Sequence, residues 1–277
     1  MSRFLVFAAA LLMAACSPDD PVTPALNTQV DMEQHESPPT VPDSRRVILA
    51  ADPWCPHNCT AGAPQEGYMV DIAREILAEA GYELEYRNYA WARSLTLARD
   101  QLISGVIGAL QGDAPDMIFP DNALGTARVA LYTRLGDPWQ YQGMESLAGQ
   151  TLLVLNGYSY SPDLDRYIAE NAQDPDKVWT LSGPAPLGRA LQLLEQGRAD
   201  VFVEEQSVME WFLRQQEIIP APRMAVVVHR APVFIAFAPD NPQSESLARL
   251  LDAGLARMTA SGRREAIMGR YGLSLSD

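Results

Sequence analysis

The chain has 277 residues, of which 47% are hydrophobic, 20% are charged and 8% are aromatic. This apolar fraction is enough for a packed core, which excludes a wholly disordered or collagen-like chain, and the length predicts about two domains or one large one. The 35 acidic residues outnumber the 21 Lys and Arg residues, so the formal net charge is -14. Nucleic acid and anionic membrane surfaces are therefore poor candidates as partners, because both bind clustered cations.

Residues 1–15 have the layout of a secretory signal peptide. Arg3 precedes an apolar run, Phe4 to Leu12, that is too short for a membrane-spanning anchor, and small residues follow it. The segment ends in Met13-Ala14-Ala15-Cys16, which resembles the lipobox of bacterial lipoproteins. The resemblance implies that Cys16 is lipidated and anchors the protein in the periplasm or at the outer face of the cell envelope. Cleavage without lipidation is the alternative, because lipoboxes prefer Leu where this chain has Met13.

The segment over 16–44 is predicted to be a disordered tether. Its residues 17–44 include six prolines and six acidic residues but few large apolar side chains. Such a stretch cannot bury enough apolar surface to offset the entropy lost on ordering. The folded body is therefore expected to begin near Arg45.

Cys55 and Cys59 remain once Cys16 is assigned to the lipid anchor, and both lie in the sequence WCPHNC. An exported protein meets oxidising conditions, which favour a disulfide that closes this short loop. A zinc site that enlists His57 is one alternative, but zinc takes about four ligands and the sequence has no second Cys/His cluster. A redox motif is the other, although two residues rather than three usually separate its cysteines. Neither a metal nor a cofactor is expected.

From Arg45 onward, short β-rich runs alternate with helix-periodic segments, which predicts an α/β protein. The first unit is a βαβαβ arrangement. Its strands and helices are expected over Val47–Ala51, Gly67–Ala80, Glu83–Tyr89, Trp91–Gln101 and Gly105–Leu110. Gly81 stands where the C′ residue of the first helix is expected.

A second unit of the same kind follows. Ser161 is the expected N-cap of its first helix, with Pro162 at the first helical position. Its other elements are expected over Leu152–Leu155, Val178–Leu181, Leu187–Leu194, Val201–Val203 and Gln206–Gln215. The sequence therefore predicts two similar α/β units in succession, and not one continuous sheet.

The last third begins with a strand-like segment, Val226–Ala238, that is interrupted at Arg230-Ala231-Pro232. A helix carrying Leu247 to Met258 follows, and a short helix ends at Tyr271-Gly272. Neither resembles a membrane span, because no segment of the body is long and apolar enough.

Four motifs follow one another along this body. They are Gly67 to Ala73 (GYMVDIA), Leu147 to Thr151 (LAGQT) with Gly157-Tyr158-Ser159, Leu194 to Glu205 (LEQGRADVFVEE), and Phe234 to Pro242 (FIAFAPDNP). In order and spacing they resemble the type 3 extracytoplasmic solute-binding proteins that serve ABC importers. The resemblance covers nearly all of residues 45–272.

The resemblance implies a type II periplasmic-binding-protein fold, with two lobes that are each a mostly parallel sheet flanked by helices and that are joined by two hinge strands. Lobe 1 would comprise residues 45–133 and 230–277, and lobe 2 residues 134–229. Such a protein is expected to be a monomer that closes around a small polar, amine-bearing or amino-acid-like solute and delivers it to a membrane ABC permease.

Three candidate ligand-binding residues follow from the positions of these motifs. In the family, the residue five positions after the Asp of the third motif often binds the ligand's ammonium group, and here that residue is Glu205. An ordinary acidic helix N-terminus is the alternative. Tyr158 and Ser159 lie at the turn that meets the ligand's carboxylate in the family. The alternative is that Ser159 only caps its own helix.

The arginine with which the family's amino-acid binders clamp a carboxylate is missing. The chain has Gly112-Asp113-Ala114-Pro115-Asp116 at that place. Either Arg93, at the start of the second helix, binds the anion instead, or the ligand has no such carboxylate. Four acids are expected near the cleft and favour a cationic or amine-bearing ligand: Asp113, Asp116, Glu204 and Glu205.

Two tryptophans are expected to face the same cleft. Trp54 lies in the loop after the first strand, and Trp91 opens the second helix. Their rings could stack on a ligand. Packing in the core is the alternative for Trp91, whereas the polar, Pro-rich loop around Trp54 would not otherwise hide an indole.

Two other classes of function compete with solute capture. A few proteins of this fold are dehydratases that act on cyclohexadienyl acids, but the sequence has no Ser/His/Asp set and no phosphate loop, so we expect no enzymatic activity. The second class is a ligand-sensing adaptor that reports to a membrane signalling partner.

Overall fold

The computed structural model describes residues 45–183, 186–218 and 220–275. The predicted signal peptide, the tether and Cys16 lie outside the described residues.

Strands and helices alternate along the described chain, which confirms the α/β class. The strands are β1 (Arg46–Ala51), β2 (Glu83–Asn88), β3 (Gly105–Ala109), β4 (Gly125–Thr133), β5 (Leu152–Leu155), β6 (Val178–Leu181), β7 (Val201–Glu205) and β8 (Arg223–Phe237). The helices are α1 (Tyr68–Glu79), α2 (Trp91–Arg99), the 3-10 helix η2 (Met144–Leu147), α3 (Pro162–Asn171), α4 (Pro186–Glu195), α5 (Gln206–Gln216), α6 (Ser244–Ala260) and α7 (Arg263–Gly269).

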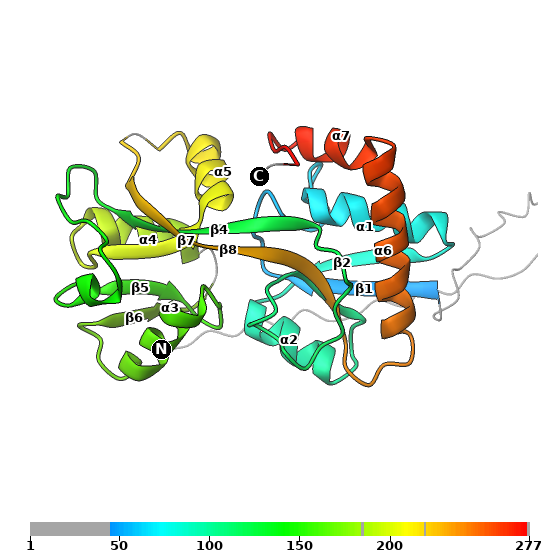
Figure 1. Ribbon diagram of the computed structural model, residues 1–277, viewed down its shortest axis with the longest axis horizontal. Helices are drawn as coiled ribbons and strands as arrows, with labels where there is room; N and C mark the ends of the chain where they lie inside the picture. The colour runs from blue at the N-terminus through cyan, green and yellow to red at the C-terminus, as the bar shows by residue number, and fades with distance from the viewer. Residues whose placement is uncertain (1–44, 184–185, 219, 276–277) are drawn as a thin grey trace, which may run out of the picture. The chain divides into compact units, whose positions relative to one another are not determined.

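The strands follow one hydrogen-bonded order, β2-β1-β3-β8-β4-β7-β5-β6 (Figure 1). β1 pairs in parallel with β2 and β3, and β5 pairs in parallel with β6 and β7. The prediction that the two units share no sheet is wrong. β8 pairs with β3 through Phe234–Phe237 and with β4 through Arg223–Val233, so a single strand belongs to both halves of the sheet.

β8 also runs through Arg230-Ala231-Pro232, where the sequence predicts a break. These residues pair with Arg128, Ala127 and Thr126 of β4, a strand that the sequence patterns above do not predict. The β4–β8 register shifts between Val129 and Ala130 and again between Leu131 and Tyr132. Pro232 pairs with Thr126, away from both shifts and before the residues of β8 that pair with β3, so the ladder with β4 outweighs its local preference.

The hydrophobic core is divided between the two halves of the sheet. One cluster contains side chains from residues 47–127 and 233–271, and two further clusters contain side chains from residues 129–228. The two smaller clusters lie on opposite faces of β5 and β7: Leu153 and Phe202 belong to one, and Leu152 and Val203 to the other. A parallel strand that is buried on both faces is apolar throughout, as β5 is. We refer to the two groups of residues as lobe 1 and lobe 2.

Two helix ends are located by residues that the sequence singles out. Ser161 is the N-cap of α3, and its side chain accepts a hydrogen bond from the backbone N–H of Leu164. Gly81 follows the end of α1 with a φ of 78°, the left-handed conformation of a C′ residue. Both predictions are confirmed.

In Figure 1, α1 lies beside α6 and α7, and α1 also contacts β2 and β3.

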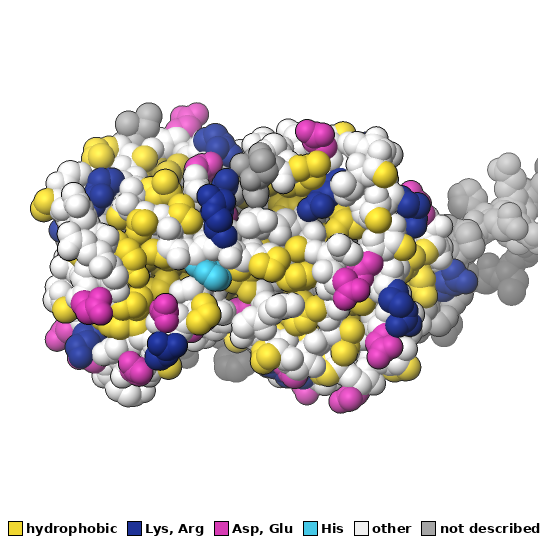
Figure 2. Space-filling view, viewed as in Figure 1, with side chains coloured by type: hydrophobic (Ala, Val, Ile, Leu, Met, Phe, Trp, Pro, Cys, Tyr) yellow, Lys and Arg dark blue, Asp and Glu magenta, His cyan; other side chains and the backbone are white. Residues whose placement is uncertain are grey.

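Charges of both signs are interspersed on the face shown in Figure 2, with apolar side chains between them. The described residues of this face therefore present no cluster of one sign such as nucleic-acid binding requires. Among the described residues, no helix has the length and hydropathy needed to cross a membrane.

Candidate functional site

A cavity of about 880 Å³ lies where the parallel strands of both lobes end. Its walls come from the segments that follow β1, β2, β5 and β6, from the end of β7, and from one side of α5. Open α/β sheets bind ligands beyond the carboxyl ends of their strands, and the volume falls in the range typical of small-molecule sites. The residues that line this cavity include Asp52, Trp54, Tyr89, Trp91, Tyr158, Glu204, Trp211 and Phe212.

The loop after β1 carries Trp54 into the cavity wall. A disulfide joins Cys55 to Cys59, as predicted, and the backbone of Trp54 pairs with that of Asn58. The loop also caps α1, because the carbonyls of Pro56 and His57 accept hydrogen bonds from the first two N–H groups of that helix. A side chain at Gly67 would lie 2.5 Å from the Asn58 backbone, so the close approach of loop and helix requires glycine there.

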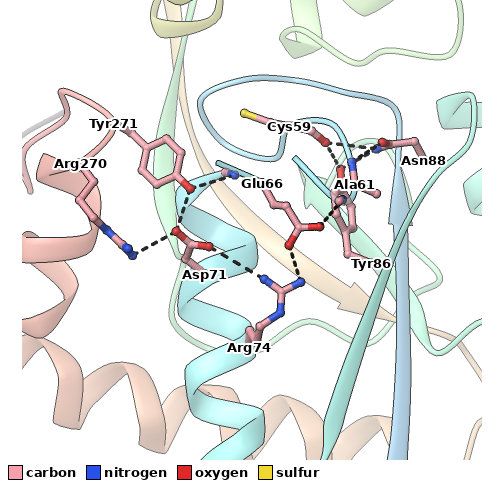
Figure 3. Close-up of polar contacts among 11 residues, drawn as sticks. Cys59, Ala61, Glu66, Asp71, Arg74, Tyr86, Asn88, Arg270 and Tyr271 are labelled. Atoms are coloured by element: carbon pink, nitrogen blue, oxygen red, sulfur yellow. Dashed lines mark hydrogen bonds and ion pairs between the residues drawn. The ribbon is translucent and has the colours of Figure 1, made fainter. Parts of the chain in front are cut away.

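Two side chains of β2 hold the same loop in place (Figure 3). The carbonyl of Cys59 accepts hydrogen bonds from the Tyr86 hydroxyl at 2.8 Å and from the Asn88 amide at 3.2 Å. Asn88 also accepts a hydrogen bond from the backbone N–H of Ala61 at 2.7 Å. Trp54 is therefore presented by a loop that is bonded to β2 as well as to itself.

The start of α1 is tied to the C-terminal segment (Figure 3). The Tyr271 hydroxyl accepts a hydrogen bond from the backbone N–H of Gly67 and donates one to Asp71. Asp71 also pairs with Arg270 at 3.1 Å and lies near Arg74. These contacts fix the helix on which the Trp54 loop rests.

Aromatic rings make up much of the cavity wall. Trp54, Trp91 and Tyr158 line it, and so do Trp211 and Phe212 of α5. The Trp54 ring stacks on the buried His57 at 4.2 Å between centroids. Three predicted site residues thus lie together on one cavity, and their contact with a ligand stays a prediction.

Two carboxyl groups line the cavity, each hydrogen-bonded to an aromatic residue of the other lobe. The Tyr158 hydroxyl donates to Oδ2 of Asp52 at 2.7 Å, and the Trp54 indole donates to Oε1 of Glu204 at 3.2 Å. Burial raises the pKa of Asp52 to about 6 in spite of the hydrogen bond from Tyr158. Burial likewise raises the pKa of Glu204 to about 8, although its donors Glu205 N–H and Trp54 oppose the rise. Both groups are held in surroundings that favour their neutral form.

Asp113 and Ser159 lie beside this cavity, on a small pocket that shares Asp52, Trp54, Trp91 and Tyr158 with it. The Asp113 carboxylate accepts hydrogen bonds from the backbone N–H of Ser159 and of Leu110, both at 2.9 Å. Burial raises the pKa of Asp113 to about 7. The Ser159 hydroxyl donates to Asp165 at 2.6 Å. Ser161 rather than Ser159 caps α3.

Glu205 does not line either pocket, although it neighbours Glu204 in sequence. It is the N-cap of α5, and its carboxylate accepts hydrogen bonds from the backbone N–H of Val208 and of Arg128. His57 Nε2 lies 3.3 Å from Oε2 of Glu205, and both side chains are 2% exposed. Burial opposes ionisation, but His57 and the two backbone donors hold the pKa of Glu205 below its ordinary value. The structure favours the alternative interpretation of Glu205, a helix N-cap.

Arg93 also lies off both pockets. Its side chain is exposed, and its guanidinium stacks on the ring of Tyr89 at 5.4 Å. Tyr89 lines the cavity, so Arg93 contacts one wall residue but does not itself line either pocket.

Three residues of the cavity wall, Asp52, Trp211 and Phe212, are not predicted from the sequence. Asp52 directly follows β1, so the rule that placed Trp54 at the carboxyl end of that strand would also have found Asp52. Trp211 and Phe212 lie on a helix whose orientation depends on packing, and no local signal identifies them. Among the described residues, no group of three or more His, Cys, Asp or Glu side chains could hold a metal ion.

No protein-family model and no curated protein matches this sequence. Solved structures do share the fold. A histidine kinase sensor domain with similarity to periplasmic binding proteins has a TM-score of 0.68 and 21% identity, over 83% of this chain and 97% of that one. A mutant of ArgBP from T. maritima has a TM-score of 0.66 and 17% identity, over 82% and 95%. AbpA from Streptococcus pneumoniae, an amino acid ABC transporter substrate-binding protein bound to L-arginine, has a TM-score of 0.64 and 17% identity, over 82% and 94%.

These likenesses cover most of both chains and show that this protein has the type II periplasmic-binding-protein fold. The predicted fold class is therefore confirmed. At such low identities the likeness extends to the fold and not to the ligand.

Proposed function

We propose that this protein is an extracytoplasmic solute-binding protein that captures a small polar, amine-bearing solute between its two lobes and passes it to an ABC importer in the membrane. The observation that carries the proposal is the cavity of about 880 Å³, which is bounded by strand ends of both lobes. A ligand there contacts both lobes, so it stabilises the arrangement in which they approach each other. Capture requires no covalent step.

The similar structures support the same function. ArgBP and AbpA have this fold, and AbpA is named as the binding protein of an amino acid ABC transporter. The predicted signal peptide and lipid anchor at Cys16 complete the proposal, because they would hold the protein at the membrane beside its permease. We propose that it acts there as a monomer, in the periplasm or on the outer face of the cell envelope.

A thermal-shift screen of the purified chain tests solute capture. A ligand that binds only the folded state stabilises it and so raises the apparent melting temperature. At a ligand concentration of one hundred times the Kd, the stabilisation is about 2.7 kcal/mol. We expect at least one class among amines, amino acids, sugars and small carboxylates to raise it in a saturable manner. If no class does, the protein is not a solute-binding protein.

A ligand-sensing adaptor is the second candidate, because a histidine kinase sensor domain has the same fold. Deleting the gene separates the two functions. An importer's binding protein is needed for uptake of the labelled ligand, whereas an adaptor is needed for the transcriptional response to that ligand and leaves its uptake unchanged. Conversion of a cyclohexadienyl acid to an aromatic product by the purified chain would instead indicate an enzyme.

A further inference from the structure

The residues of charged type on the cavity wall are all acids. Asp52 and Glu204 line the large cavity, and Asp113 lines the small pocket beside it. Among the described residues that line either pocket there is no Arg, Lys or His. A ligand carboxylate entering here would lose its hydration without gaining a cationic partner and would lie near three acids.

The backbone donor that could replace such a cation is already taken. The N–H of Ser159 lies at the turn between β5 and α3, where an anion would be held by backbone groups. In this structure it donates to Oδ1 of Asp113 at 2.9 Å, and Leu110 N–H donates to the other oxygen at 2.9 Å. A carboxylate of the protein itself thus occupies this backbone donor, and the Ser159 hydroxyl donates to Asp165.

The remaining wall suits a positive charge. Glu204 is 2% exposed and reaches the cavity beside the indole of Trp54, which donates a hydrogen bond to it. Asp52 lies beside the Tyr158 ring and accepts a hydrogen bond from its hydroxyl. A cation gains from a desolvated carboxylate and from the faces of aromatic rings at the same time, and both kinds of group are present on this one surface.

We propose that the ligand is an organic cation without a carboxylate group, held by Glu204 and Asp52 and by the aromatic rings around them. This inference rests on the proposed solute-binding function and narrows its substrate class. It departs from the amino-acid ligand that AbpA binds. Because Asp113 already accepts the hydrogen bond of the Ser159 N–H, a ligand with an α-carboxylate binds more weakly here than the same ligand without one.

Matched pairs that differ only in the α-carboxylate test the inference. We would measure calorimetric affinities of the full chain for agmatine against L-arginine, cadaverine against L-lysine, and choline against glycine betaine. The first two pairs probe primary amines and guanidines, and the third probes quaternary ammonium. We expect the member without a carboxylate to bind at least tenfold more tightly in at least one pair, and its acid partner to be favoured in none.

The opposite results separate the two proposals. If the amino acid binds as tightly as its decarboxylated partner or more tightly, the ligand class is wrong and solute capture stands. The same holds if no member of any pair binds while a sugar or a simple carboxylate does. If no solute of any class binds, solute capture itself fails.

Two variants test the assigned residues. Glu204→Gln keeps the shape and the hydrogen bond from Trp54 but cannot ionise when a cation binds, and we expect the affinity for the preferred amine to fall at least tenfold. Glu210→Gln, an exposed position on α5, is the matched control and should leave it unchanged. Asp113→Ala frees the Ser159 N–H, so the preference for agmatine over arginine should narrow. An unchanged preference in Asp113→Ala, or an unchanged amine affinity in Glu204→Gln, would overturn the assignment.

Discussion

The indole N–H of Trp54 lies 3.2 Å from Oε1 of Glu204 and donates a hydrogen bond to it, across 150 residues of sequence and between the two lobes. The same carboxylate oxygen accepts a second hydrogen bond from the backbone N–H of Glu205 at 2.8 Å. Both residues line the cavity. Glu204 is thus placed in the site by an aromatic residue that is itself held by a disulfide-closed loop.

The first prediction concerns the cost of burying Glu204. Its pKa is raised from 4.5 to about 8 in the folded protein, so between these values the unfolded chain ionises while the folded protein keeps the proton. The unfolded state then binds fewer protons, and the free energy of unfolding falls as the pH rises through this window. Gln cannot ionise, so the Glu204→Gln variant does not lose stability in this window. The melting temperature of the variant minus that of the native chain should be larger at pH 8 than at pH 5, by at least about 3 °C. Calorimetric melts at both pH values measure the difference.

Glu210→Gln is the control for that experiment, because it makes the same substitution at an exposed residue of α5. Its effect on the melting temperature should not depend on pH. A pH-independent difference for Glu204→Gln would show that Glu204 is ionised in the folded protein at pH 5.

The second prediction concerns the pH dependence of amine binding. Asp52 and Glu204 have pKa values of about 6 and about 8 without ligand, and a bound cation favours their ionised forms. Other groups near Glu204 are the carboxylate of Glu205 and the indole of Trp54. Affinity for agmatine should therefore rise as the pH increases from about 5.5 to about 8.5, since a primary amine stays charged throughout. Calorimetric titrations at four pH values give the slope, and a flat or falling profile contradicts the role of these acids.

The third prediction separates Glu205 from Glu204. Glu205 pairs with His57 at 3.3 Å, and both side chains are buried. Glu205→Gln removes the buried carboxylate that faces His57 and accepts hydrogen bonds from two backbone N–H groups, so it should lower the free energy of unfolding by about 2 kcal/mol. Urea denaturation measures this loss.

Amine affinity measured well below the melting temperature should change less in Glu205→Gln than in Glu204→Gln, because Glu205 lies off the cavity. If Glu205→Gln instead keeps full stability and loses amine binding, Glu205 rather than Glu204 contacts the cation.

The fourth prediction concerns Trp54. The chain has five tryptophans, and Trp54 lies on the cavity beside Glu204, so ligand binding should change its fluorescence. Trp91 and Trp211 also line the cavity, so we expect Trp54→Phe to lose a part of the ligand-induced change and not all of it. Trp179, which lies under the guanidinium of Arg198 and off the cavity, is the control, and Trp179→Phe should keep the change. A fluorescence change of undiminished size in Trp54→Phe would place the ligand away from this ring.

Local patterns in the sequence were sufficient for much of the fold. The N-cap at Ser161 and the glycine after α1 depend on residues only a few positions apart, and both are where the sequence predicts them. The disulfide follows from the spacing of Cys55 and Cys59 and the predicted compartment. Trp54, Trp91 and Tyr158 reach one cavity because each follows a parallel strand, and strand ends of one direction gather at one edge of a sheet.

The sequence alone determined the α/β class, the end of α1, the start of α3, and the segments after β1, β2 and β5 that line the cavity, because each of these follows from residues close together in the chain. Only the tertiary structure decided that Glu204 faces the cavity while Glu205 caps α5, since adjacent residues at a strand end point in different directions. The tertiary structure also paired Asp113 with Ser159 across 46 residues, and joined both lobes through β8. Such contacts are set by packing between distant segments, which no local pattern records.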